Sequence, residues 1–164
     1  MKPINYFLLI LLLLFSVILD VSFFSSLALN GASIMSAYLI LMIGAVISKG
    51  RVFLVSLFAV TIFYSIFTSL PLFILLINFV IFPFFINFIR FRFFPKPALF
   101  SSLFYFVSAF ALLFLVSLIY ENSWDARAFS TMPYFVILNS AIGLIFYQIF
   151  LKAEAKLKVG EIKF

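Results

Sequence analysis

The chain has 164 residues, of which 67% are hydrophobic, 21% aromatic and only 10% charged. A soluble domain is about half apolar and about a quarter charged, so this chain cannot bury its apolar surface in a core and lipid must be its solvent. Because the sequence has no Cys and no His, it excludes disulfides, thiol catalysis, the usual zinc and haem ligands and a histidine base. The net charge of +6 comes from residues at the ends of apolar segments, which indicates membrane orientation rather than nucleic-acid binding.

Apolar runs separated by polar or basic breaks predict an all-α, polytopic membrane protein with one domain, residues 1–151, and a basic cytoplasmic tail, residues 152–164. The expected transmembrane helices cover residues 4–24, 33–48, 52–69, 71–89, 98–120 and 132–151. The second run is short for a full crossing. The fourth helix is expected to begin at Pro71, because proline is favoured in the first helical turn.

The polar ends of these segments indicate where the membrane ends. Asp20 lies near the end of the first helix, so we expect it close to the outer interface. Residues 121–131 are the only long polar stretch between helices and predict a solvated loop. The tail has the spacing of a continued cationic helix.

The distribution of basic residues predicts the orientation of the chain. All but one of the eleven Lys and Arg residues lie before the first helix, in the second and fourth links, or in the tail; the exception is Arg127. Since cytoplasmic segments carry an excess of basic residues, both termini are expected in the cytoplasm. The residues expected to anchor the inner interface, or to meet anionic lipid or a cytoplasmic partner, are Lys49, Arg51, Arg90, Arg92 and Lys96.

Small and hydroxyl-bearing residues recur at helical spacing within the apolar runs, which predicts close helix packing with hydrogen bonds between helices. One such series is Asn139, Gly143 and Tyr147. A ligand pocket is the alternative interpretation. The candidate contacts between helices or with partners are Asp20, Tyr64, Ser69, Pro71, Asn78, Pro83 and Asn139.

Asn78 and Pro83 interrupt the fourth apolar run. An unpaired amide in hydrocarbon costs about 2–7 kcal/mol, so Asn78 is expected either to bond to a neighbouring helix or to line a cavity. Pro83 lacks a backbone donor and frees the carbonyl of Phe79, which predicts a kink near the middle of the helix.

The chemistry of an intramembrane enzyme is missing from the sequence. It has no aspartate-rich metal motif, no Ser-Lys pair, no Gly-rich phosphate loop and no carboxylate at the expected membrane centre. We therefore expect a protein that is not an enzyme and that needs no cofactor or metal.

Taken together, the chain resembles the rod shape-determining protein MreD family of small bacterial inner-membrane proteins. The resemblance rests on a polar residue that ends the first helix, a short outer loop, a basic link, a polar turn with proline, an arginine-rich end of the fourth helix and a lysine tail. In this sequence these features are Asp20, the loop SSLALNGAS, Lys49-Gly50-Arg51, Thr68-Ser69-Leu70-Pro71-Leu72, Arg90-Phe91-Arg92-Phe93-Phe94 and the residues from Lys152 onward.

The resemblance implies a multi-pass protein of the bacterial cytoplasmic membrane that acts as a scaffold in cell-wall elongation. It also implies membrane protein partners, namely an MreC-like protein and cell-wall synthesis proteins, besides the membrane lipids. Two positions depart from the family pattern. Many members carry Asp near the end of the third helix and Gly after the Pro-Leu pair, where this chain has Tyr64 and Phe73.

An alternative is the substrate-binding membrane subunit of an energy-coupled vitamin importer, which is also a six-helix protein of this size. In that interpretation Asn78, Tyr105 and Asn139 line a pocket. The small-residue motif with which such subunits dock their transporter partner is not visible near the start of the sequence.

Overall fold

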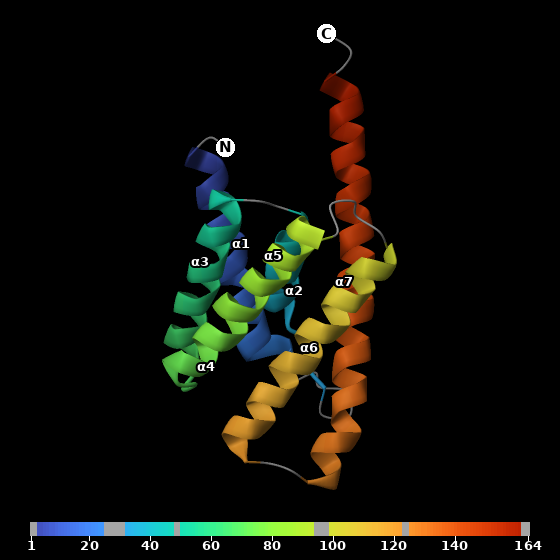
Figure 1. Cartoon of the computed structure of the whole chain (residues 1–164). Coiled ribbons are helices and arrows are strands. Elements are labelled where there is room, and N and C mark those ends of the chain that lie inside the picture. Colours follow the sequence, from blue (N-terminus) through green and yellow to red (C-terminus); the bar gives the residue numbers. More distant parts are fainter. Residues whose placement is uncertain (1–2, 25–31, 48–49, 94–98, 123–124, 162–164) are drawn as a thin grey trace.

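Figure 1 shows the computed structural model of the chain, in which helices run back and forth along one direction. The structure describes residues 3–24, 32–47, 50–93, 99–122 and 125–161. Its helical elements are α1 (Pro3–Leu19), η1 (Asp20–Phe24), α2 (Ser36–Ile47), α3 (Arg51–Phe67), α4 (Leu72–Leu76), η2 (Ile77–Ile81), α5 (Phe82–Phe93), α6 (Leu99–Glu121) and α7 (Ala126–Glu161). The two π-helical turns are continuous with their neighbours, so η1 extends α1 and η2 joins α4 to α5.

The all-α fold class is confirmed, since the described residues contain no strand and each of the six apolar runs contains a helix. Three helices are long and apolar enough to cross a membrane: Leu72–Phe93, Phe100–Glu121 and Ala126–Lys152. Three shorter apolar helices accompany them: Leu9–Phe24, Ser36–Ile47 and Val52–Phe67. The helices of the described chain therefore suit a membrane environment.

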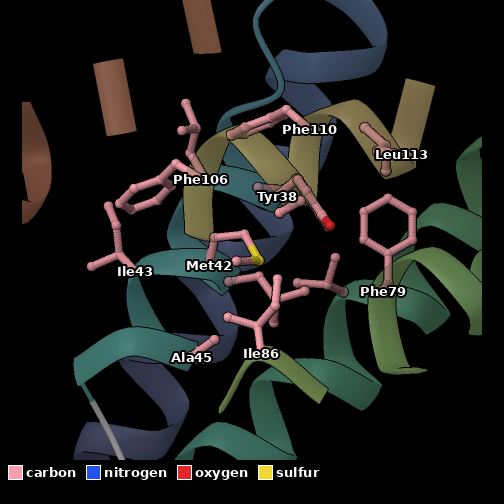
Figure 2. Close-up of a cluster of buried hydrophobic side chains, with 14 of the residues drawn as sticks. Tyr38, Met42, Ile43, Ala45, Phe79, Ile86, Phe106, Phe110 and Leu113 are labelled. Atoms are coloured by element: carbon pink, nitrogen blue, oxygen red, sulfur yellow. The ribbon is translucent and has the colours of Figure 1, made fainter. Parts of the chain in front are cut away.

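When continuous elements are counted as one helix, α2 is the shortest helix, and it lies at the centre of the bundle. It packs against α1, α3, α5, α6 and α7, and eight of its twelve residues are buried. Figure 2 shows the surrounding core, with Tyr38 and Met42 of α2 next to Phe106 and Phe110 of α6 and Phe79 of η2. A helix that is apolar on all sides is expected to be surrounded by others, and α2 fulfils that expectation.

The predicted start of the second helix is wrong by three residues. Residues 33–35 are not helical, so the backbone just before Ser36 must find its hydrogen bonds outside a helix.

The solvated loop predicted for residues 121–131 is also partly wrong, because α7 already begins at Ala126. Asp125 caps this helix: its Oδ1 accepts a hydrogen bond of 2.7 Å from the Ala128 N–H. An aspartate at this position satisfies one of the unpaired donors of the first turn. At the other end α7 continues without a break to Glu161, so most of the predicted tail is a helix.

Close contact between helices occurs at Gly143 of α7. A Cβ atom at this position would lie 2.8 Å from the Phe106 ring of α6 and 3.1 Å from the Leu39 side chain of α2. The absence of a side chain therefore allows three helices to meet, as expected from the small-residue spacing.

Large apolar side chains cover the outside of the bundle. The Phe100 side chain is 81% exposed, and many others on every long helix are more than half exposed, among them Phe7, Phe58, Phe88 and Ile137. Soluble proteins rarely expose continuous apolar surface of this extent, so the exterior is suited to lipid or to other apolar helices.

Candidate functional site

The carboxylate of Asp20 is buried and accepts four hydrogen bonds from two other helices. Its Oδ1 accepts from the Ser36 N–H at 2.6 Å and from the Ser36 hydroxyl at 2.7 Å. Its Oδ2 accepts from the Ala37 N–H at 2.9 Å and from the Tyr64 hydroxyl at 2.6 Å. Only 8% of the residue is exposed, so Asp20 faces the interior of the bundle and not an aqueous edge. The carboxylate therefore caps the first turn of α2 from a different helix, where a negative charge also meets the positive end of the helix dipole.

Asp20 is the first residue of the π-helical turn η1. Such turns are rare and often occur at functional positions, because they change the direction of the side chains that follow the extra residue. In α1, the turn before η1 also contributes to the contact with α2. The backbone carbonyl of Ser16 accepts a 3.2 Å hydrogen bond from the Ser36 hydroxyl.

The side chain of Asn139, on α7, forms hydrogen bonds to the non-helical residues that precede α2. Its Oδ1 accepts a hydrogen bond from the Met35 N–H at 3.0 Å, and its Nδ2 donates to the carbonyls of Ser33 and Phe135 at 3.0 and 2.9 Å. The side chain is fully buried. The Asn139 amide thus supplies hydrogen-bond partners to backbone groups outside the helix, the Met35 N–H and the Ser33 carbonyl.

Three side chains, those of Asp20, Tyr64 and Asn139, surround the start of α2. We call these three side chains the clamp. The first α-helical hydrogen bond of α2 runs from Leu39 to Met35. The N–H groups of Met35, Ser36 and Ala37 have no helical acceptor, and the clamp supplies one for each. The sequence predicted contacts for each of the three clamp residues, but it did not predict that they meet at one helix end.

A cavity of about 180 Å³ lies next to the clamp. It is bounded by the segment before α2, by α3 and the turn after it, by η2, and by parts of α6 and α7. Its lining residues are Ser33, Met35, Tyr64, Leu70, Asn78, Phe79, Leu113, Phe114, Ser117 and Phe135. Of the three pocket residues proposed from the sequence, Asn78 lines this cavity, whereas Asn139 and Tyr105 are not among its lining residues.

Asn78 lies in η2 and is only 3% exposed. Its Oδ1 has no hydrogen-bond partner among the described residues, so the predicted bond to a neighbouring helix is not formed by this atom. The alternative prediction, a lined cavity, describes its position. An unpartnered amide oxygen in an apolar interior is costly, which makes Asn78 the least explained polar group of the site.

Pro83, the second residue of α5, lies two positions after the end of η2 and accounts for it. Because proline cannot donate a hydrogen bond to the carbonyl of Phe79, the helix cannot keep its regular pattern here. The N–H of Phe82 instead bonds to the carbonyl of Ile77, five residues earlier. The kink predicted near Pro83 stays a prediction, but the backbone before Pro83 does form a π-helical turn, which contains Asn78.

The predicted turn between the third and fourth helices contains Ser69 and Pro71. Pro71 is the N-cap of α4 and not its first residue; its carbonyl accepts hydrogen bonds from the N–H groups of Ile74 and Leu75 at 3.0 and 3.3 Å. Ser69 is exposed. These two residues form the corner of the hairpin and do not reach the clamp.

The basic residues predicted at the inner interface differ in position. Arg92 is exposed, whereas Arg90 is only 4% exposed, with its guanidinium carbon 4.9 Å from the centroid of the Phe91 ring. Arg90 is therefore not a simple surface anchor. Arg51 begins α3. Lys49 and Lys96 lie outside the described residues.

The sequence interpretation missed several contributors to this site. Ser36 was not singled out, although serine at the start of an apolar helix is a helix-capping signal. Ser33 and Ser117 line the cavity and were not selected as pocket residues. Asn87 was not among the predicted contact residues, yet its Nδ2 donates a 2.6 Å hydrogen bond to the Ala45 carbonyl of α2.

The site has the chemistry of a structural clamp beside a small polar cavity. The four donors around Asp20 engage both of its oxygens, and the described chain contains no cluster of three or more His, Cys, Asp or Glu residues that could hold a metal. Comparison of the chain with protein-family models, curated proteins and solved structures finds no match. The fold and the site therefore define an all-α protein with membrane-suited helices, and its function must be inferred from these features.

Proposed function

We propose that this protein is a non-enzymatic scaffold of the bacterial cytoplasmic membrane, similar to MreD, that crosses the membrane six times with both termini in the cytoplasm. The observation that carries the proposal is the use of Asp20. An ionisable residue inside a membrane protein is by default a candidate for catalysis or transport. Here the carboxylate is committed to holding one helix end, which supports a structural role for the polar interior.

The arrangement of the helices supports the proposed orientation. The start of α1, the α2–α3 and α5–α6 ends and the end of α7 lie at the same end of the bundle, uppermost in Figure 1. Arg51 and Arg92 belong to helix ends on this side. With the positive-inside rule, that end is the cytoplasmic one.

The apolar exterior supplies the surfaces through which a scaffold would work. Helix association in a membrane depends on packing, and aromatic side chains on α5 and α6 offer large contact areas. Exposed examples are Phe84, Phe85, Phe88, Phe93, Phe100 and Phe104. In the proposed function, some of these side chains contact the membrane helix of an MreC-like partner and the remainder contact lipid.

Depletion of the protein in its own rod-shaped host tests this proposal. We expect the cells to become round, and the protein to co-purify with an MreC-like partner. A photo-crosslinking residue at Phe88 of α5 should capture that partner, and the same residue at Phe58, which is similarly exposed on α3, is the matched control. Normal cell shape together with crosslinks to lipid alone would refute the scaffold function.

A second candidate function is the substrate-binding subunit of an energy-coupled vitamin importer. The cavity beside the clamp, with the unpartnered amide oxygen of Asn78, favours it. A vitamin that co-purifies with the protein, or neighbouring genes for transporter ATPases, would support this candidate. A neighbouring gene for an MreC-like or penicillin-binding protein would support the scaffold.

A further inference from the structure

One side of α2 is left uncovered, although the rest of this helix is enclosed. Eight of its twelve residues are buried, and the four that are only half-buried are Ser36, Ile40, Gly44 and Ile47. Because they recur at intervals of four, four and three residues, they form one stripe along the helix. The helices α1 and α7 both pack against α2, but within the described residues they make at most slight contact with each other. The stripe is therefore the part of α2 that its neighbours do not cover.

An apolar cavity of about 220 Å³ lies over the second half of this stripe. Ile40, Gly44 and Ile47 contribute to its lining, together with residues of α1, the first two turns of α3 and the outer part of α7. Two of the lining residues, Leu12 of α1 and Phe150 of α7, are 48% and 51% exposed. The cavity therefore reaches the apolar outside of the bundle, where lipid is the expected solvent.

The lining offers apolar contact and little polar chemistry. None of the described lining residues is charged. Ser56 is polar, but its hydroxyl already donates a 2.9 Å hydrogen bond to the Val52 carbonyl. A polar ligand would lose its hydrogen bonds to water here and gain little in return, whereas an alkyl chain gains from the burial of apolar surface.

The length and position of the cavity fit part of one lipid leaflet. Ile40 and Ile47 are seven residues apart, about 10 Å along a helix, while half of a hydrocarbon core is about 15 Å thick. Ile47 is the last residue of α2 and Val52 is the second residue of α3, so the cavity begins at the helix ends and extends inwards. A whole helix is about 10–12 Å across, so only a narrower body can lie along the cavity.

The cavity begins at the end of the bundle where basic residues gather, uppermost in Figure 1. Arg51 is the first residue of α3, directly before the lining residue Val52, and Lys152 on α7 is exposed. In the sequence, Lys49 precedes Arg51 by two residues, and Glu154 is the nearest acidic residue to Lys152. The local excess of positive charge favours an anionic headgroup at this level.

We propose that this cavity is a specific site for one anionic phospholipid of the surrounding membrane. One acyl chain lies along Ile40, Gly44 and Ile47, and the phosphate lies at the level of Arg51. The proposal goes beyond the scaffold function, because a scaffold can carry a bound lipid and the tests of cell shape and co-purification do not depend on it.

Native mass spectrometry of the purified full-length protein tests the proposal. The protein is released from detergent micelles that contain increasing dioleoyl phosphatidylglycerol, which is anionic, or dioleoyl phosphatidylcholine, which has the same acyl chains and no net charge. We expect one saturable phosphatidylglycerol, bound roughly fivefold more tightly than phosphatidylcholine. Arg51→Gln should remove most of this preference. Arg92→Gln should keep it, because Arg92 is exposed at the same end of the bundle but lies on α5, outside the cavity.

Variants of the cavity wall test the position of the acyl chain. Leu12→Trp adds bulk at the opening and should weaken the binding of both lipids roughly three- to tenfold. Leu11→Trp is the matched control, since Leu11 is similarly exposed on α1 and does not line the cavity. Phe150→Ala removes part of the wall and should weaken binding roughly two- to fivefold. Its control is Ile149→Ala, because Ile149 is similarly exposed and lies outside the lining.

Three results would overturn the proposal. Binding without saturation, or equal lipid affinity in the unmodified protein, Leu12→Trp and Phe150→Ala, would indicate only the general layer of lipid around the bundle. Equal affinities for the two lipids would refute the anionic headgroup. Unchanged lipid binding together with reduced co-purification of a protein partner in the two wall variants would assign the cavity to side chains of that partner's helix. The scaffold function is judged separately, by cell shape after depletion of the unmodified protein.

Discussion

The two ends of α2 are held in different ways. At its start, the clamp makes five hydrogen bonds to residues between Ser33 and Ala37, and Tyr64 donates a sixth to Asp20 within the clamp. At its end, the Asn87 side chain donates a hydrogen bond to the Ala45 carbonyl of the helix backbone. Near that end lies an apolar cavity of about 220 Å³, whose lining residues are Leu9, Leu12, Ile40, Ile43, Gly44, Ile47, Val52, Ser56 and Phe150.

The difference has a physical cause in the position of the two ends. The start of α2 follows a half-buried, non-helical segment, so its first N–H groups have no helical partners. They require acceptors from other helices, and a carboxylate is the strongest acceptor the chain offers. At the other end of α2, apolar packing can take the place of such hydrogen bonds. Variants at the two ends show how much each end contributes to stability.

Asp20→Ala should have the largest effect. It leaves two backbone donors and the Tyr64 hydroxyl without their acceptor, while the Ser36 hydroxyl keeps only the Ser16 carbonyl, so we expect the free energy of unfolding to fall by roughly 2–4 kcal/mol. Unfolding in mixed micelles with increasing denaturing detergent, followed by circular dichroism, measures the loss. Asp20→Asn is the control, since it keeps one acceptor oxygen and should be affected less. Stability equal to that of the unmodified protein would show that the clamp is not needed.

Asn139→Leu should be next, with a loss of roughly 1–3 kcal/mol, because the Met35 N–H and the Ser33 carbonyl lose their partner. The adjacent Ser140 provides a matched control: it is buried, but its hydroxyl has no partner in the described part of the chain. Ser140→Ala should therefore be neutral or slightly stabilising in the same unfolding measurement. Equal losses in the two variants would contradict the role assigned to Asn139.

Tyr64→Phe should cost roughly 1–2 kcal/mol, less than Asp20→Ala, since the carboxylate keeps three of its four donors. The ring remains, so its stacking on Phe79 is retained. A double-mutant cycle with Asp20→Ala isolates the contact, and the effect of Tyr64→Phe should largely disappear in the Asp20→Ala background. Full additivity of the two losses would mean that the hydroxyl and the carboxylate do not interact.

Asn87→Leu should have the smallest effect, about 0.5–1.5 kcal/mol, because it removes one bond to a neutral carbonyl at the other end of α2. The same denaturing-detergent titration gives the value. Our comparison predicts that Asn139→Leu is more destabilising than Asn87→Leu. The reverse order would show that the end of α2, and not its start, is the more firmly held.

Much of the fold was predictable because apolar length and proline position are local signals. The six helical runs and the hairpin corner at Pro71 follow from them, and the irregularity near Pro83 follows from a missing donor. The first turn of α7 was also encoded in the sequence, by Asp125 as a helix cap, but the polar composition of the stretch favoured a loop. That error came from weighing composition above a capping signal.

The candidate site was predictable only as a set of residues. Asp20, Tyr64, Asn78 and Asn139 were selected because polar groups in an apolar chain need partners. Their partners come from helices far apart in the sequence, and helical spacing gives the face of a residue but not the neighbour of that face. For the same reason Arg90 was expected at the surface, whereas it lies in the interior.

The sequence alone determines that this protein is helical and that lipid suits its exterior, and it predicts that all basic residues but Arg127 lie at one end. These properties follow from hydrophobicity and charge, which act on each segment separately. Only the tertiary structure decides that α2 starts at Ser36, that Asp20 and Asn139 hold it, and that Asn78 lines a cavity while its buried Oδ1 has no partner among the described residues. Hydrogen bonding is directional and pairwise, so its outcome depends on which helices meet.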